Sequence, residues 1–457
     1  MSTGVIYIAA GNRFIDGAIT QPRASLPSQC RSPFRSFGYH LYLVYSRQFL
    51  SCNASLFWRL RRLVPEISAS MKKIKVLYVY VGFYRDAGGE HTPLGLAEQL
   101  DRERFQFEIV ARMPSTSSIG AAVLATGCII HQLGPGIPSL RDPRGMIKAI
   151  YEFYKTFRRI RPDIVHTQAG FCNVWARLAA KLARVPVIIA TLNFGGGPKP
   201  QWFLRPFIRL MHSWLSTSTS AYVCVAKHLI KEELLPHEWG RAEIISDFFD
   251  SKRFLAGRTE LPEIRALKNA DRPLLAIVGR LEYEKGHRVA IAAMRRIVDV
   301  VSDAQLMIVG SGTLEQELRD QVKALRLSDN VEFTGHRTQI CDIMSNIDLL
   351  LIPSYNEAFG HVVLESIAAG VPLLGSRSGA FPEILENGKY GTLVDSLDPD
   401  AWADAALDII ANPAPALAKL KEARAKVLTR YTKEESVRRH ANLYMRLVED
   451  FSGSNRT

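Results

Sequence analysis

Two cations and two carboxylates follow apolar runs in the second half of the sequence, and together they suit a ligand with both charge and hydroxyl groups. Arg280 and Lys285 come directly after the run LLAIV, and Glu357 and Glu365, with seven residues between them, follow the run LLLIP. Arginine offers a planar fork to phosphate and lysine offers a mobile point charge, whereas a carboxylate accepts hydrogen bonds from paired hydroxyls. Each residue taken alone fits an exposed loop at least as well, but the four together predict a pocket for a nucleotide sugar.

A second group of residues offers backbone N–H groups to an anion at the start of two expected helices. The first N–H groups of a helix have no partner within it, and the helix dipole favours negative charge there. The glycines that precede the first of these helices are not spaced as G-x-G-x-x-G, so the dinucleotide fingerprint is absent. The residues expected to line the site in this way are Gly88, Gly89, Phe359, Gly360 and His361.

The elements that must position these residues alternate along the chain, because strand-like apolar runs are separated by helix-like segments. We expect strands at 74–80, 106–111, 128–133, 163–166, 186–191, 221–225, 273–279, 304–309, 330–334, 347–352, 371–375 and 392–394. We expect helices at 90–100, 144–160, 171–184, 286–301, 313–326, 338–345, 360–369, 399–411, 414–428 and 432–450. Such alternation predicts parallel sheets covered by helices, which bind ligands at the carboxyl ends of their strands.

The predicted fold is therefore α/β, with two Rossmann-like doubly wound domains facing across a cleft. A loose segment near 250–272 separates the two sets of strands. We predict an N-terminal extension at 1–70, a first domain at 71–250, a second domain at 251–430, and a helix with a tail at 431–457 that crosses back onto the first domain.

Residues 1–70 differ from the rest, since they hold eight arginines, no lysine and two acidic residues, and show no sustained period. Three interpretations compete: a misassigned start, a disordered or membrane-touching extension, and a transit peptide. The run MKKIKVLYVY, which begins at Met71, leads directly into a buried strand and favours the misassigned start. Peptides from residues 14–60 in mass spectra of the native protein would overturn that interpretation.

Charge and cysteine content narrow the functional class. Lys and Arg number 58 against 45 Asp and Glu, a net charge of +13, yet residues 251–457 hold 27 basic and 28 acidic residues. The basic front of the chain suits phosphate, acidic lipid or nucleic acid, and a solvated basic surface explains it equally well. The six cysteines form no C-x-x-C or C-x-x-H pair, which gives zinc and redox motifs no support and indicates a reduced, cytoplasmic protein.

An ordered series of motifs carries a family resemblance. The second half contains V-G-R-L-x-x-x-K-G at 278–286, I-V-G-S-G at 308–312, V-E-F-T-G at 331–335, P-S-x-x-E-A-F-G-x-x-x-L-E at 353–365, A-A-G-V-P at 368–372 and G-A-F-P-E-I-L-E-N-G-K-Y-G-T-L-V at 379–394. The first half adds G-G-E-H at 88–91 and P-D-I-V-H at 162–166. Over nearly all of 71–445 the sequence resembles the retaining GT-B glycosyltransferases of family four, which build bacterial glycolipids and polysaccharides.

The resemblance implies a catalytic role for three residues. Arg280 and Lys285 would hold the donor diphosphate and offset the charge that grows on the leaving group, which is the electrostatic work of a metal in other transferases. Glu357 would contact the donor sugar, and Glu365 would hold the ribose. The reaction would retain the anomeric configuration, with the acceptor entering on the leaving-group face, and neither a metal nor a cofactor is expected.

The resemblance also makes 251–430 the donor domain and 71–250 the acceptor domain. Gly88 and Gly89 would close on the donor phosphates, and the base would lie near Gly335, His336 and Arg337. The remaining implied donor contacts are Gly279, Phe359, Gly360 and His361. The acceptor-side candidates are His91, His166 and Asn193.

Two departures from the family pattern bear on activity. Asn193 stands where the family often carries a histidine that faces the donor sugar, and an amide cannot take a proton at neutral pH. A front-face mechanism does not require a base there, so activity is still expected. The interdomain turn, usually of the type Pro-Asn-Gly-Val-Asp, is Ser-Asp-Phe-Phe-Asp at 246–250. The lost glycine puts the local backbone in question, and the two aromatic residues could reshape the cleft.

Several alternatives remain open at this point. A nucleotide-sugar epimerase on the same scaffold, a non-catalytic nucleotide-sugar binder and a nucleic-acid binder each fit part of the pattern; the last fits poorly, because the chain lacks a basic–aromatic recognition motif. The only Asp-x-Asp is Asp398-Pro399-Asp400, and it reads as a helix N-cap followed by proline at the first helical position rather than as a metal site.

The acceptor side shows two stretches in which cations flank aromatic residues, at 144–161 and 202–209. Such a helix can lie on an anionic bilayer, or it can pack its aromatic stripe into the core. We expect a cytoplasmic enzyme that attaches peripherally to the inner face of the cytoplasmic membrane and uses a lipid-linked or envelope-glycan acceptor. Nucleic acid is not an expected partner.

Overall fold

The structure is a computed structural model, and it divides into two units, Met1–Lys72 and Lys73–Thr457. In the first unit it describes only two short antiparallel strands, β1 (Ala9–Ala10) and β2 (Arg13–Phe14), so the expectations for residues 1–70 lie outside the described residues. The described parts of the second unit are 72–83, 88–134, 136–139, 142–193, 205–251, 254 and 272–454, without the side chains of 205–209, 212 and 454.

The first of two large sheets has seven strands, all parallel, in the order β5-β4-β3-β6-β7-β8-β9. We call the part of the chain built on it the seven-stranded domain. Its strands are β3 (Ile74–Tyr80), β4 (Phe105–Ala111), β5 (Ile129–Gln132), β6 (Ile164–Gln168), β7 (Val187–Leu192), β8 (Ala221–Cys224) and β9 (Ala242–Ile244).

Helices cover both faces of this sheet. Its helices are α2 (His91–Gln99), α3 (Ser118–Ala125), α4 (Pro143–Ile160), a π-helical turn (Cys172–Ala176) that leads into α5 (Arg177–Leu182), α6 (Arg205–Ser216) and α7 (His228–Glu233). One face packs in a single apolar cluster with α2 and α3, and the other packs with α4 and α5. Strands β3, β6, β7 and β8 are buried almost throughout, as expected for a parallel sheet covered on both sides.

The second sheet has six parallel strands in the order β12-β11-β10-β13-β14-β15. We call this part the six-stranded domain. Its strands are β10 (Leu274–Val278), β11 (Gln305–Val309), β12 (Val331–Gly335), β13 (Leu349–Ile352), β14 (Leu373–Ser376) and β15 (Thr392–Val394). Its helices are α10 (His287–Val300), α11 (Glu315–Ala324), α12 (Ile340–Met344), α13 (His361–Ala369), α14 (Phe381–Ile384), α15 (Pro399–Ala411) and α16 (Ala414–Lys426).

Both sheets share one topology, because each begins in the middle, grows to one side for two strands and then returns to grow on the other side. The strand order reverses between β3 and β6 in one sheet and between β10 and β13 in the other. Ligands of such sheets bind outside the carboxyl ends of the strands at this switch point. The loops after β3, β10 and β13 hold the glycine pair, the two cations and Glu357, so these five residues follow strands at the two switch points.

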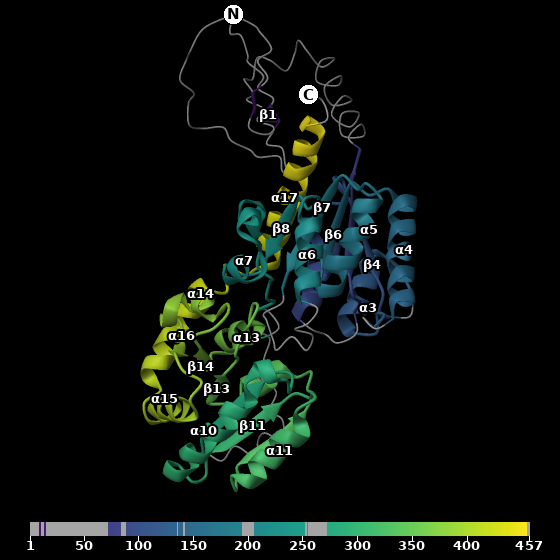
Figure 1. The fold of residues 1–457 in the computed structure, drawn as a ribbon. Coiled ribbons are helices and arrows are strands. Elements are labelled where there is room, and N and C mark those ends of the chain that lie inside the picture. Colours follow the sequence, from purple (N-terminus) through teal and green to yellow (C-terminus); the bar gives the residue numbers. More distant parts are fainter. Residues whose placement is uncertain are drawn as a thin grey trace, which may run out of the picture. The chain divides into compact units, whose positions relative to one another are not determined.

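The C-terminal helix α17 (Lys433–Ser454) returns to the seven-stranded domain. Val437, Leu443 and Tyr444 are buried in the same apolar cluster as β3, β4 and α2. The Ser436 hydroxyl donates to the carbonyl of Ser246, and the backbone N–H of Phe249 donates to the carbonyl of Tyr431. Figure 1 shows this helix in yellow, and it contacts α2 and β7, which are far from it in the sequence.

The fold class predicted from the sequence is confirmed: both domains are doubly wound and parallel. Most expected strands and helices agree with the observed bounds to within one or two residues. The sequence analysis missed β9, α3, α6, α7 and α14. Within the described part of the chain, every helix is too short or too polar to cross a bilayer.

Candidate functional site

Lys285 and Glu357 form the centre of the candidate site. The Lys285 ammonium lies 2.5 Å from Glu357 Oε2, and both side chains are largely buried. Lys285 ends a 3₁₀ turn (Tyr283–Lys285) after β10, and Glu357 lies in the loop after β13. The two loops are joined by a hydrogen bond from the backbone N–H of Tyr355 to the carbonyl of Glu284. A cation and a carboxylate from neighbouring strands thus share one position, where a phosphate and a sugar hydroxyl could each take one partner.

Arg280 is held differently from Lys285. Its guanidinium pairs with Glu284 at 2.7 Å and is 57% exposed, so it stands at the edge of the site rather than inside it. The backbone around it is tightly packed, because a Cβ on Gly310 would lie 1.9 Å from the carbonyl oxygen of Gly279. The exposed ion pair is weak, and Arg280 can leave it for a stronger anion.

The loop that carries Glu357 is fixed by the segment after β14. The backbone N–H of Ala380 donates to the carbonyl of Glu357, and a Cβ on Gly379 would lie 2.2 Å from that oxygen. Gly360, in the left-handed region at φ 88°, turns the chain into α13. Glu365 lies on α13, one turn after His361, and is half-buried.

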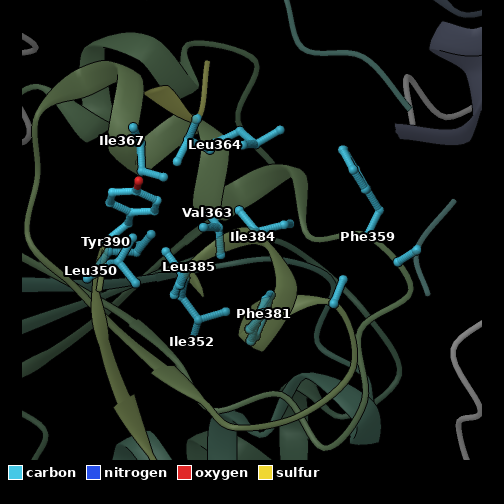
Figure 2. Packing of buried hydrophobic residues seen from close by; sticks show 14 of the residues in the cluster. Leu350, Ile352, Phe359, Val363, Leu364, Ile367, Phe381, Ile384, Leu385 and Tyr390 are labelled. Carbon is cyan, nitrogen blue, oxygen red and sulfur yellow. The ribbon is translucent and has the colours of Figure 1, made fainter. Parts of the chain in front are cut away.

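Apolar packing holds α13 in place beneath the site. Phe359 is buried, and Val363, Leu364 and Ile367 belong to the same cluster. Figure 2 shows these α13 side chains and Phe381 converging with residues of β13, α14 and the following loop. The N-terminal N–H groups of α13 therefore face the site from a helix whose apolar side is anchored.

The glycine pair reaches the site from the seven-stranded domain. Gly88 and Gly89 form a 3₁₀ turn before α2. A Cβ on Gly88 would lie 2.4 Å from Cδ2 of His361, so only glycine fits where the two domains meet. Behind the turn, Gln168 donates to the carbonyl of Gly89 at 3.1 Å and accepts from the Tyr78 hydroxyl at 2.6 Å.

His361 and His91 lie together at this contact. Their ring centroids are 5.9 Å apart, and Nε2 of His361 lies 3.6 Å from a carboxylate oxygen of Asp247. Burial alone would lower the pKa of His361, but Asp247, followed by Glu365 and Glu357, raises it above the usual value. The structure thus brings His91, Gly88 and His361 together with the loop of Glu357.

The placement of His166 corrects its assignment to the acceptor side. The side chain is fully buried, with Nδ1 2.7 Å from the Tyr444 hydroxyl and Nε2 2.6 Å from the Thr191 hydroxyl. Burial, followed by the nearby His440, holds the pKa of His166 well below its usual value. A neutral imidazole with both nitrogens occupied inside the core joins β6 to α17, and an acceptor has no access to it.

Two other residues singled out in the sequence lie outside the loops that carry Lys285 and Glu357. Arg337 follows β12, two strands from β10, and its Nε donates to the carbonyl of Thr334 at 3.1 Å. Asp398 is the N-cap of α15, as predicted, and its side chain accepts from the backbone N–H of Asp400. Asp400 in turn forms an ion pair with Arg296 at 3.5 Å.

Two family profiles match the chain in succession. The family described as Glycosyltransferase Family 4 matches residues 87–252, and the family described as Glycosyl transferases group 1 matches residues 262–427. The chain belongs to this glycosyltransferase family. It is therefore a retaining glycosyltransferase of the GT-B class that uses a nucleotide sugar. Membership selects glycosyl transfer over the epimerase and binding-protein alternatives.

Curated relatives of this glycosyltransferase act on different acceptors. Glycogen synthase of Mycobacterium tuberculosis (strain ATCC 25618 / H37Rv) is 28% identical over 299 residues, which cover 64% of this chain and 70% of that protein. UDP-Gal:alpha-D-GlcNAc-diphosphoundecaprenol alpha-1,3-galactosyltransferase of Escherichia coli is 24% identical over 354 residues, 74% of this chain and 88% of that protein. Membership of the family therefore does not determine the acceptor.

A solved structure shows the same fold. The crystal structure of Anabaena HepE in complex with UDP and glucose matches with a TM-score of 0.67 and 18% identity, over 81% of this chain and 99% of that one. At this identity the likeness supports the architecture of two parallel α/β sheets and leaves the individual site residues to be argued from this chain.

The structure accommodates both departures from the family pattern, Asn193 and the altered interdomain turn. Asn193 lies beside the glycine pair, 3.2 Å from where a Cβ on Gly89 would stand. Phe248 is buried against α2 at Gly95 and does not adopt a positive φ, so its position does not require glycine. Phe249 packs instead against an apolar cluster that is shared by both domains and includes Cys224 of β8 and Val363 of α13. The two aromatic residues therefore anchor one turn into both domains.

Sequence reasoning missed the polar residues that support the glycine pair. Tyr78, Gln168 and Thr191 are buried within strands, where they did not interrupt the apolar pattern. Asp247 was noted only as part of an altered turn. A polar residue in a fully buried parallel strand needs a partner, and that rule was the signal that could have singled them out.

Proposed function

We propose that this transferase moves a hexose from UDP- or GDP-sugar to a lipid-linked or envelope-glycan acceptor at an anionic membrane surface. The observation that carries the acceptor side is an outward basic face on α4. The donor side rests on the Lys285–Glu357 pair and on the glycine turn that faces it.

On the donor side, Lys285 and Arg280 bind the diphosphate, Glu357 contacts the sugar and Glu365 holds the ribose. Arg337 faces the base, and the backbone of Gly279, Phe359, Gly360 and His361 completes the pocket. During transfer the acceptor oxygen bonds to the anomeric carbon while the bond from that carbon to the diphosphate oxygen breaks. The acceptor proton goes to the departing diphosphate, whose negative charge the two cations stabilise.

The basic face of α4 supports a membrane site. Met146, Ala149, Phe153 and Phe157 are buried, so part of the aromatic stripe does pack into the core. The opposite side of the helix exposes Ile147 and Tyr151, at 67% and 59%, among cations. The exposed residues of this face are Arg144, Ile147, Lys148, Tyr151, Lys155, Arg158 and Arg159.

This face suits an acidic lipid surface for two reasons. The apolar side chains at 147 and 151 can enter the headgroup region, and the surrounding Lys and Arg attract anionic lipids. Helix α4 is the next helix after β5, which is two strands from β3, the strand that leads to the glycine pair. The second basic stretch, 202–209, lies outside the residues whose side chains are described. The E. coli relative, by its name, uses a lipid-diphosphate acceptor, which agrees with this proposal.

Thermal unfolding tests the donor assignment. The full chain is heated with UDP, GDP, ADP or dTDP and with the corresponding sugar nucleotides. A ligand at a hundred times its dissociation constant adds about 2.7 kcal/mol of stability. We expect one nucleotide to raise the melting temperature, and Glu365→Ala to abolish the shift. A folded protein that responds to none of them would overturn the donor assignment.

Flotation on liposomes tests the membrane assignment. The variant Lys148→Glu with Lys155→Glu reverses two charges on the α4 face, and Lys421→Glu with Arg424→Glu makes the same change on exposed α16. At about 1 kcal/mol per basic residue near an anionic surface, the α4 variant should bind vesicles with phosphatidylglycerol at least about 30-fold more weakly. Equal binding by both variants, or equal binding to neutral vesicles, would overturn it.

A further inference from the structure

A buried carboxylate lies between a helix of each domain. The side chain of Asp247 is 7% exposed. One of its oxygens accepts a hydrogen bond from the hydroxyl of Thr92, on α2, at 2.6 Å. The other lies 3.6 Å from Nε2 of His361, the first residue of α13. The same carboxylate therefore contacts the helix behind the glycine pair and the helix behind the donor pocket.

The ring of His361 fills the space between Gly88 and α13. It is 22% exposed, and a Cβ on Gly88 would strike two of its ring atoms. Phe359 packs edge-on against the ring with centroids 5.0 Å apart, which limits its rotation. The side chain of His361 is therefore the contact through which the glycine pair meets the six-stranded domain.

The charges around this ring favour a cation. The ionisable groups that face it are Asp247 from the interdomain turn, His91 from α2, Glu357 from the loop after β13 and Glu365 from α13 itself. Glu357 is already paired with Lys285. A positive charge at a helix N-terminus is unfavourable by itself, so a protonated histidine at this position needs a nearby carboxylate. Asp247 supplies it.

We propose that Asp247 is a positioning residue whose carboxylate keeps His361 as an imidazolium against the glycine pair, so that α13 presents a third cation to the donor diphosphate. This inference rests on the proposed donor site. Arg280 and Lys285 are each already paired with a glutamate. The proposal gives a reason for a further pair, Asp247 with His361, beside them. The imidazolium adds a charge-assisted donor at the point where the glycine turn closes.

A histidine NMR titration without ligand tests the ion pair itself. The full chain carries ¹³C-labelled histidine, and His361→Gln identifies the signal of His361. We expect Asp247→Asn, which keeps the shape and an acceptor for Thr92, to lower the pKa of His361 by at least about one unit. Glu98→Gln, which removes an exposed α2 carboxylate paired with Lys433, should leave it unchanged. An unchanged pKa in Asp247→Asn would overturn the proposal.

Calorimetric binding of UDP and GDP between pH 7 and pH 9 tests the consequence for the donor. Binding to the natural protein should weaken as His361 loses its proton. Asp247→Asn should bind about tenfold more weakly at pH 7 and should show no further loss up to pH 9. Binding that is the same in both proteins would overturn the role in donor recognition. If neither nucleotide binds the natural protein, the donor assignment fails, and the NMR titration still decides the ion pair.

Discussion

The two domains have similar strand orders, yet they place different kinds of residue at the carboxyl ends of their strands. The six-stranded domain places ionised side chains on loops: Lys285 with Glu357 and Arg280 with Glu284. Behind the glycine pair, the seven-stranded domain places neutral groups inside strands, as in the link from Tyr78 through Gln168 to Gly89. The six-stranded domain can therefore exchange ion-pair partners for a ligand, whereas the seven-stranded domain holds a backbone turn in one position.

The difference shows that two domains of similar topology can contribute different properties to one site. Ion pairs on loops can open when a phosphate arrives, because the phosphate takes the place of the carboxylate on the cation. A buried neutral network has no such substitute and stays closed, since breaking it leaves polar groups without partners. Catalytic charge is therefore expected from the six-stranded domain, and geometric precision from the seven-stranded domain.

The largest expected effect comes from removing the central cation of the six-stranded domain. Lys285→Ala leaves Glu357 without its partner and the departing diphosphate without one cation, so kcat should fall by about 10²–10³. Release of nucleotide from the donor identified by thermal shift measures this. Lys389→Ala, which loses exposed ion pairs with Glu386 and Glu422 and a contact over the Tyr390 ring, should keep full activity. A loss below tenfold in Lys285→Ala would remove the contrast between the domains.

The second test moves the glycine turn of the seven-stranded domain. In Gly88→Ala the new methyl would meet the His361 ring, so the turn must shift and the KM for donor should rise about 10- to 100-fold. The melting temperature should stay nearly constant, because the shift is local. Gly170→Ala is the matched control, since a Cβ there has nothing within 4 Å. An unchanged KM would mean that the turn does not set donor geometry.

A third test concerns pH. One histidine in each domain should change the free energy of unfolding with pH, and the two changes should have opposite signs. Burial lowers the pKa of His440, in the seven-stranded domain's cluster with α17, to about 4. The unfolded chain therefore binds a proton that the folded chain does not, and stability is lost as pH falls below about 6.5 toward 4. His440→Gln should reduce the stability difference between pH 7.5 and pH 5 by roughly 2 kcal/mol, measured by urea unfolding.

The raised pKa of His361 has the opposite sign. Its contribution to stability is present below about pH 6.5 and is lost as pH rises through its higher folded pKa. His361→Gln should therefore flatten the alkaline side of the stability curve and leave the acid side unchanged. A change on the acid side in His361→Gln, or on the alkaline side in His440→Gln, would contradict this division.

The smallest expected effect compares one helix cap from each domain. Asp142 caps α4 by accepting from the N–H of Gly145, and Asp398 caps α15 by accepting from that of Asp400. Asp142→Ala and Asp398→Ala should each lower the free energy of unfolding by about 1 kcal/mol, whereas the asparagine variants keep the cap. Two separate transitions in urea unfolding, each shifted by only one of the variants, would show that the domains do not unfold as one cooperative unit.

The sequence predicted most of the strands because their apolar runs are long and bounded by loop residues. It missed β9 because three half-buried residues at a sheet edge give little signal. It missed α3 because the sequence SIGAAVLA lacks the polar side that reveals a surface helix. Periodicity needs length and contrast, and these two segments lack one or the other.

The charged part of the site was predictable, and the neutral part was not. Arg280, Lys285 and Glu357 follow apolar runs directly, so their place at the strand ends could be inferred from order alone. His166 carried the same kind of signal but lies inside the core, because its strand continues to Gln168. The pairing of Asp247 with His361 depends on how two domains meet, which no local pattern encodes.

Helix α17 has a consequence for how the protein is made. It is the last described helix, yet Tyr444 completes the cluster around β3 and bonds to His166. At about 5–20 residues per second, translation reaches this helix many seconds after β9 has left the ribosome. Until then the seven-stranded domain exposes the apolar surface that α17 later covers. The seven-stranded domain is therefore synthesised before the six-stranded domain and completed after it, and its exposed apolar surface needs protection from aggregation until α17 emerges.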